Sequence, residues 1–100
     1  KKCLDLRIFE DDGGKMNLSL LDVEGDVMVV SQFTLYGDCR KGRRPDFTRS
    51  ATSARANGLY REFIDILEGI YPRVSEGVFG AHMMIDMVND GPVTLVIDRE

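Results

Sequence analysis

The sequence predicts an α+β domain that is mainly β and has one principal amphipathic helix. Short alternating or β-branched segments recur between turn clusters rich in Gly, Asp and Asn, as strands and hairpins do. One long stretch, residues 52–69, instead carries apolar residues at helical spacing. No repeat, linker or low-complexity segment divides the chain, so residues 1–100 are expected to form a single domain.

The first third of the chain predicts three strands. Residues 6–9 form a short β-like run, and residues 16–20 alternate apolar and polar side chains after a glycine-containing turn. A second turn at residues 22–26 leads into residues 27–30, whose continuous apolar character predicts a central, buried strand. The chain opens on Lys1 as if within the last turn of a helix or strand, so we expect an N-terminal segment to be missing.

The remainder predicts a loop, a helix and three extended segments. Residues 38–48 form the loop, and the helix is expected from a Thr52 or Ser53 N-cap as far as Gly69. Residues 74–79 are predicted to be extended, and residues 82–87 alternate as a strand does. A turn at residues 89–92 precedes residues 93–97, a strongly β-prone final strand.

Composition limits the function classes. The formal net charge of -4 argues against a general nucleic-acid coat, so any nucleic-acid contact must be local. No apolar run approaches the ~20 residues of a membrane span and no signal-peptide pattern is present, so a cytoplasmic protein is expected. Cys3 and Cys39, with His82 as the sole histidine, form neither a disulfide framework nor a zinc site, and neither a metal nor a cofactor is expected.

The first segment that could carry chemistry is Ser31, Gln32, Phe33 and Thr34, which follows an apolar run. Ser and Thr beside turns more often satisfy local backbone groups than attack a substrate. A hydroxyl nucleophile also needs a base, and His82, a lone histidine among methionines, completes no triad. Any hydrolysis is therefore expected to depend on positioning and on backbone N–H donors.

Two further segments allow both a plain and a functional interpretation. The turn at residues 89–94 is either a simple connection or a rigid backbone element aimed at a ligand, and the isomer of its Gly91-Pro92 bond stays open. The basic loop, which we define as Arg40, Lys41, Arg43 and Arg44, is either solvated surface or a local phosphate site.

Together, two of these segments resemble the signature motifs of the D-aminoacyl-tRNA deacylase family. They are Ser31-Gln32-Phe33-Thr34 and Asn89-Asp90-Gly91-Pro92-Val93-Thr94, in this order and at this separation. Each motif alone is weak, but the pair is specific. The resemblance covers essentially the whole chain, through residues 7–9, 14–18, 44–47 and 77–83.

The resemblance implies a barrel-like antiparallel or mixed sheet and a homodimer with two active sites at its interface. The implied reaction is hydrolysis of the ester that joins a D-amino acid, or glycine mischarged on tRNA-Ala, to tRNA, without a cofactor. In the family the element matching Gly91-Pro92 is cis and enters the partner's site, where its carbonyls hold the substrate α-amino group. An L side chain would collide with the pocket wall. The expected missing segment corresponds to the family's first strands and a helix.

The resemblance also implies roles for single residues. The 3′-terminal adenosine and its ester would be received by the catalytic segment Ser31, Gln32, Phe33 and Thr34, with backbone N–H groups near Phe33 and Thr34 as oxyanion donors. The 2′-hydroxyl of the RNA would assist, and Thr34 as a nucleophile is the less favoured alternative. Substrate binding would involve Asn89, Gly91, Pro92, Ala56, Phe79 and Met83. The basic loop would contact tRNA phosphates.

Two other functions are weighed against this one. A non-catalytic nucleic-acid-binding module would use the basic loop and leave the hydroxyl-rich segment structural. The animal-type paralogue removes a mischarged L-amino acid with a trans Gly-Pro element, but it typically has Pro where this chain has Ser31.

Overall fold

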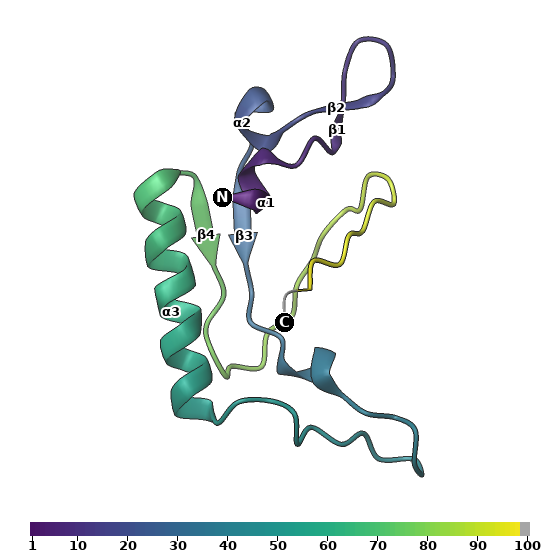
Figure 1. Cartoon of the computed structure of the whole chain (residues 1–100), viewed down its shortest axis with the longest axis vertical. Coiled ribbons are helices and arrows are strands. Elements are labelled where there is room, and N and C mark those ends of the chain that lie inside the picture. The colour runs from purple at the N-terminus through teal and green to yellow at the C-terminus, as the bar shows by residue number, and fades with distance from the viewer. Residues whose placement is uncertain (99–100) are drawn as a thin grey trace.

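The computed structural model describes residues 1–98, which are arranged around a short parallel strand pair (Figure 1). The N-terminal part contains α1 (Lys2–Asp5), β1 (Phe9–Glu10), β2 (Met16–Leu18) and α2 (Leu20–Val23). β3 (Val27–Val29) then leads into the 3-10 helix η1 (Phe33–Tyr36), and after a long loop come α3 (Ser53–Ile70) and β4 (Val74–Glu76). The α+β class and the single principal helix are confirmed.

Two small sheets replace the predicted barrel. β1 and β2 pair antiparallel, and β3 pairs parallel to β4, with Val27 opposite Val74 and Val29 opposite Glu76. Parallel strands need a long crossover, and η1, the loop and α3 supply it. Across residues 1–98 helical residues outnumber strand residues, so the prediction of a mainly β chain is wrong, and no sheet closes into a barrel, so the barrel-like sheet is not confirmed.

α3 begins where its sequence predicts. The Thr52 side chain accepts a hydrogen bond from the Arg55 backbone N–H, as an N-cap does, and the helix ends one residue beyond the expected Gly69. Its buried face consists of Tyr60, Ile64 and Leu67, at helical spacing. Figure 1 shows α3 lying alongside β4, on the side away from β3.

The core is small and lies where α3 meets the strand pair and the first helices. Its buried cluster is packed against partly buried valines of β3 and β4, and consists of Leu4, Leu20, Leu67 and Tyr71. Tyr60 and Ile64 complete the buried apolar residues. The radius of gyration is 16.0 Å, above the ~13 Å typical of a compact domain of this length. Much apolar surface therefore stays exposed.

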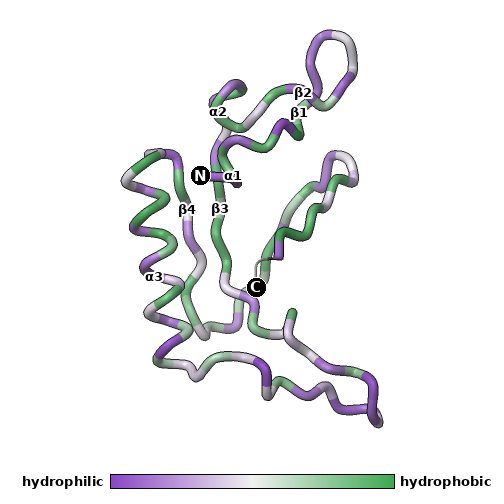
Figure 2. The backbone as a smooth tube through the Cα atoms, in the orientation of Figure 1, coloured by the Kyte–Doolittle hydropathy of each residue, from purple (hydrophilic) through white to green (hydrophobic). Residues whose placement is uncertain are grey.

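β3 is not the central, buried strand that its apolar run predicts. Among the described residues it pairs with β4 alone, and its Met28 side chain is 60% exposed. A fully apolar strand is buried on both faces only when other elements cover both of them. Here one face is left open, although Figure 2 shows the strand as continuously hydrophobic.

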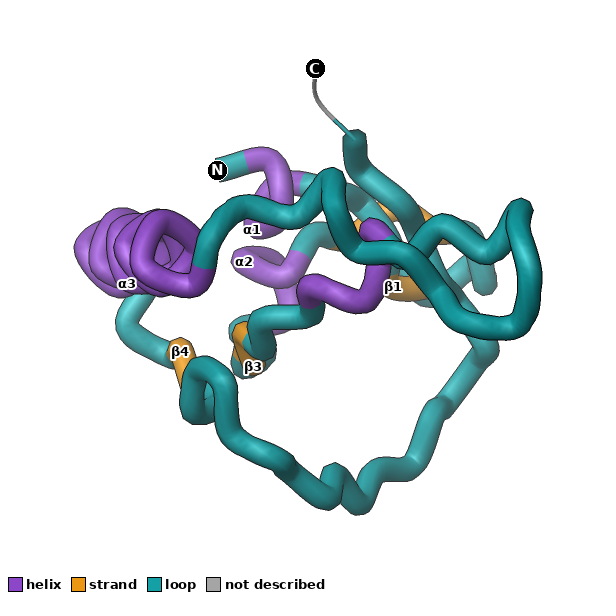
Figure 3. Tube along the Cα trace, turned by 90° about the horizontal axis from the view of Figure 1, so that it is seen from below, coloured by secondary structure: helices purple, strands orange, loops and turns teal. Residues whose placement is uncertain are grey.

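The C-terminal arm, which we define as residues 80–98, corrects two strand predictions. Residues 82–87 and 93–97 form no strand, because within residues 1–98 they have no partner for their backbone hydrogen bonds. Figures 1 and 3 show the arm as a folded-back loop apart from α3. Its side chains are largely exposed, with Met84 at 94% and Val96 at 90%.

A one-turn helix, α2, occupies part of the predicted strand 16–20 and turn 22–26. Ser19 caps it: the Ser19 hydroxyl accepts from the Asp22 N–H at 3.2 Å, and the Ser19 N–H donates to Asp22 Oδ2 at 2.9 Å. The second of these bonds lowers the pKa of the Asp22 carboxyl. The reciprocal pair fixes the turn that delivers the chain into β3.

Candidate active site

The predicted catalytic segment begins at Ser31, two residues after β3 ends at Val29. Gln32 precedes η1, and its side-chain amide donates to Thr34 Oγ1. Phe33 is held from the far side of the loop, because the Ser50 hydroxyl donates to the Phe33 carbonyl at 3.3 Å and the Phe47 ring lies edge-on to the Phe33 ring at 5.1 Å. Two contacts across the sequence therefore fix the backbone at Phe33.

The hydrogen bonding around Thr34 offers backbone donors and no base. An amide nitrogen cannot take up a proton, so Gln32 does not activate the Thr34 hydroxyl. Within residues 1–98, the backbone N–H groups of Phe33 and Thr34 donate to no protein acceptor, as expected for the first donors of a helix. The segment thus presents two N–H groups that a developing oxyanion could accept from.

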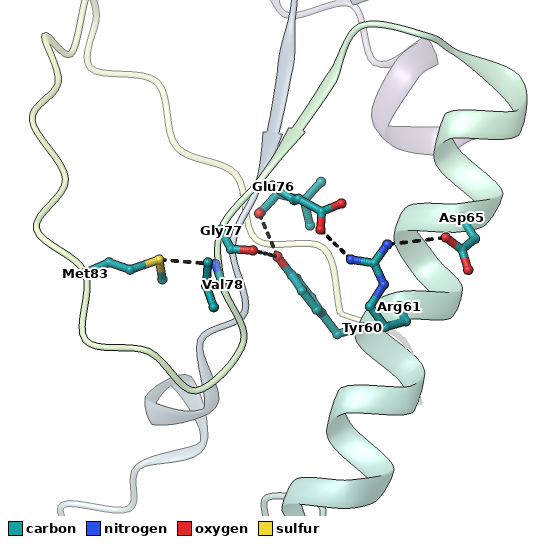
Figure 4. Close-up of polar contacts among 8 residues, drawn as sticks. Tyr60, Arg61, Asp65, Glu76, Gly77, Val78 and Met83 are labelled. Carbon is teal, nitrogen blue, oxygen red and sulfur yellow. Dashed lines mark hydrogen bonds and ion pairs between the residues drawn. The ribbon is translucent and has the colours of Figure 1, made fainter.

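Phe79 and Met83 lie close to the ends of β3 and β4. The half-buried Phe79 ring packs against Tyr60, with ring centroids 5.8 Å apart. The Met83 sulfur accepts from the Val78 N–H at 3.4 Å (Figure 4). Ala56 is half-buried on α3, one turn before Tyr60 and on the same face. Three of the predicted substrate-binding residues are thus placed around these strand ends.

The predicted Gly-Pro element lies away from the catalytic segment of the same chain (Figure 1). Asn89, Gly91 and Pro92 are exposed in the turn of the C-terminal arm, and the Gly91-Pro92 bond is cis. Figure 1 shows this turn apart from η1. The described chain by itself therefore does not bring the two signature motifs together.

The basic loop is exposed throughout but its charges are not equivalent. Backbone hydrogen bonds between Asp38 and Asp46, at 2.8 and 2.9 Å, close the base of the loop. Arg40 binds the Asp38 carboxylate with Nε at 2.9 Å and Nη2 at 2.7 Å. This pair lowers the pKa of Asp38 and raises the pKa of Arg40. In the described part of the chain, Lys41, Arg43 and Arg44 make no ion pair.

A pocket of about 210 Å³ lies between the basic loop and η1. The pocket is lined by Arg40 and Arg49, together with Leu35, Tyr36, Gly37 and Asp38. The Arg49 guanidinium lies over the Tyr36 ring, 5.5 Å from its centre, in a cation–π arrangement. The residues around the catalytic segment are thus more cationic than the net charge of the chain suggests.

Three residues near the site were not predicted to take part in it. Phe47 and Ser50, which hold Phe33, come from the loop, and Tyr60, predicted only as an apolar position of the helix, comes from the buried face of α3. Among residues 1–98, no group of three or more His, Cys, Asp or Glu side chains is arranged to hold a metal ion. None of the described helices is long and apolar enough to cross a membrane.

Comparison with known proteins identifies the family of this chain. The model of a family described as D-Tyr-tRNA(Tyr) deacylase matches residues 1–98. The chain belongs to the D-Tyr-tRNA(Tyr) deacylase family, which makes it a member of a hydrolase class, and the resemblance read from the two motifs is confirmed.

Particular relatives are named D-aminoacyl-tRNA deacylases. The chain is 61% identical over 100 residues to the D-aminoacyl-tRNA deacylase of Petrotoga mobilis, and 56% identical over 100 residues to that of Thermosipho africanus. These alignments cover 99% and 100% of this chain and 67% of each relative. The chain thus spans about two thirds of the length of these relatives.

A solved structure shares the fold. The protein titled c-Myc DNA Unwinding Element Binding Protein superposes with a TM-score of 0.82 at 40% sequence identity. The match covers 92% of this chain and 63% of that one. The short strands and single principal helix therefore belong to a known architecture.

Proposed function

We propose that this chain hydrolyses the ester joining a D-amino acid, or glycine, to the 3′-terminal adenosine of tRNA. The observation that carries the proposal is the family match over residues 1–98, which includes both signature motifs. A non-catalytic nucleic-acid-binding module is not favoured, because the curated relatives are named as deacylases.

The proposed mechanism uses backbone groups and the RNA. Water attacks the ester carbonyl carbon with assistance from the RNA 2′-hydroxyl. The bond from that carbon to the ribose oxygen then breaks, and a proton from the attacking water passes to the ribose oxygen, which leaves the free amino acid and a ribose hydroxyl. The N–H groups of Phe33 and Thr34 stabilise the tetrahedral oxyanion. Support comes from their freedom from protein acceptors in the described structure and from the absence of a base on Thr34.

We further propose a homodimer in which the arm of one chain completes the site of the other. The arm carries Gly91-Pro92 away from its own catalytic segment, and exposes β-prone residues that lack strand partners in the described chain. In the partner's site the carbonyls of Gly91 and Pro92 would hold the substrate α-amino group, while Phe79, Met83 and Ala56 line the pocket for the adenosine. Light scattering on the purified protein would show twice the chain mass.

The function is tested by incubating the chain with matched D-aminoacyl- and L-aminoacyl-tRNA and following the remaining ester. We expect the D ester to be hydrolysed much faster than its spontaneous rate, while the L ester is spared. Retardation of tRNA in a gel with the D ester left intact would establish the binding module instead. Preferential loss of the L ester would assign the chain to the L-specific branch of the family.

Thr34→Ala should retain turnover within about tenfold of the wild type, because the substitution keeps the backbone N–H that stabilises the oxyanion. Steady-state kcat on D-aminoacyl-tRNA measures this. Thr34→Ser is the matched control, since it keeps a hydroxyl. Complete loss of turnover in a folded Ala variant, with activity preserved in the Ser variant, would establish a hydroxyl nucleophile.

Arg43 and Arg44 are proposed to contact tRNA phosphates, because they make no ion pair among the described residues. Replacing both with Gln should weaken tRNA binding and reduce the slope of log K against log salt by about two. A salt titration of binding measures the slope. Lys2→Gln removes another exposed positive charge, on α1 near the N-terminus, and should leave the slope unchanged. An unchanged slope in the double variant would remove the loop from the interface.

A further inference from the structure

The two strands of the parallel pair separate at one point. The Gly77 N–H donates to the Val29 carbonyl at 2.9 Å, and this is the last hydrogen bond between the two strand segments. Two residues beyond Val29 the catalytic segment begins, and two residues beyond Gly77 lies Phe79. We call this point, between Val29 and Gly77, the fork. It sets the position of the catalytic segment relative to Phe79.

A single side chain from α3 binds both branches of the fork. The Tyr60 hydroxyl lies 3.1 Å from the Val29 carbonyl oxygen and 3.0 Å from that of Gly77, so its proton is shared between two acceptors (Figure 4). Tyr60 is only 9% exposed, and its ring packs beside Phe79. Among residues 1–98, no other side chain donates to either carbonyl.

We propose that Tyr60 is a positioning residue for deacylation. Its hydroxyl fixes the distance between the ends of β3 and β4, and so holds the catalytic segment in register with Phe79 and Met83. This inference rests on the proposed function. A small change in the separation of the branches would move the oxyanion donors relative to the adenosine pocket, and misplacement by about 1 Å can cost about a hundredfold in rate.

Packing alone does not account for this tyrosine. A phenylalanine would fill the same volume and keep the contact with Phe79, so the hydroxyl is the part that ties the strands together. The next residue, Arg61, also links α3 to β4 through an ion pair with Glu76, and it pairs at 3.5 Å with Asp65 on its own helix. Its side chain is 44% exposed, and such pairs contribute little.

Arg61 therefore provides the matched control. Tyr60→Phe removes the hydrogen bonds from α3 to both branches of the fork, whereas Arg61→Gln removes an ion pair between α3 and β4 alone. For Tyr60→Phe we expect kcat on D-aminoacyl-tRNA to fall about tenfold while KM stays within about twofold, because the groups that bind tRNA are unchanged. Arg61→Gln should leave both constants at the wild-type values.

Amide hydrogen exchange gives a readout that does not depend on activity. Exchange at the Gly77 amide, whose N–H donates to the Val29 carbonyl across the fork, should become faster in Tyr60→Phe and not in Arg61→Gln. If the wild type hydrolyses the ester and Tyr60→Phe matches it in kcat, or if Arg61→Gln loses as much, the positioning role is wrong. If the wild type leaves the ester intact, the proposed function fails, and unchanged exchange in Tyr60→Phe would separately overturn the fork.

Discussion

Gly91→Ala should lower kcat/KM for D-aminoacyl-tRNA about a hundredfold. A Cβ atom at Gly91 would lie 2.6 Å from the Val93 backbone nitrogen, closer than real Cβ contacts allow. Backbone cannot rotate out of the way as a side chain can, so the turn itself must shift. If the carbonyls of this turn hold the substrate amino group, as proposed, a shift of about 1 Å is enough for a loss of this size. Steady-state deacylation measures it.

Gly69→Ala is the control for this substitution. It makes the same chemical change in α3, where nothing lies within 4 Å of the added Cβ, and alanine favours a helix by up to about 1 kcal/mol. Its activity should stay within about twofold of the wild type. Should Gly91→Ala remain fully active while Thr34→Ala loses turnover, the chemistry would have to move from the Gly-Pro carbonyls to the Thr34 hydroxyl.

The features predicted correctly are those whose causes are local. α3 follows from apolar side chains repeated at helical spacing and from the Thr52 cap, all within one stretch of sequence. α2 carries the same kind of local signal, since Ser19 and Asp22 have the spacing of a capping box. A short helix there could have been predicted in place of a strand end and a turn.

The features predicted wrongly depend on partners. Residues 93–97 have strong β propensity, but a strand also needs a neighbour for its N–H and C=O groups, and propensity does not supply one. The prediction for β3 was wrong for the same reason, because a continuous apolar run is typical of a strand covered on both faces. Both segments suit neighbouring strands or covering elements, and the described chain by itself provides only some of these.

The candidate site was also predicted only in part. The two motifs could be found in the sequence because they resemble those of a known family, whereas the residues that hold the catalytic segment in place could not be found. Ser50 reaches Phe33 across 17 positions and Tyr60 reaches Val29 across 31. Contacts over such separations follow from how α3 and the loop fold back, and neither periodicity nor spacing encodes them.

Ile64→Ala should destabilise the chain by about 3 kcal/mol. The side chain is 0% exposed on the buried face of α3, and its truncation both loses apolar burial and leaves a cavity. Small domains are stable by only about 5–15 kcal/mol, and with few buried apolar residues this core has little to replace the loss. Urea unfolding followed by far-UV circular dichroism measures the change in the free energy of unfolding.

Ile66→Ala isolates burial as the cause. It removes the same atoms from the same helix and gains the same helix propensity, but Ile66 is 58% exposed, so a change within about 0.5 kcal/mol is expected. Equal losses in the two variants would mean that α3 does not pack against the strand pair as described. Because Tyr60 lies one turn before Ile64 on the same buried face, the fork that positions the catalytic segment would then lose its support as well.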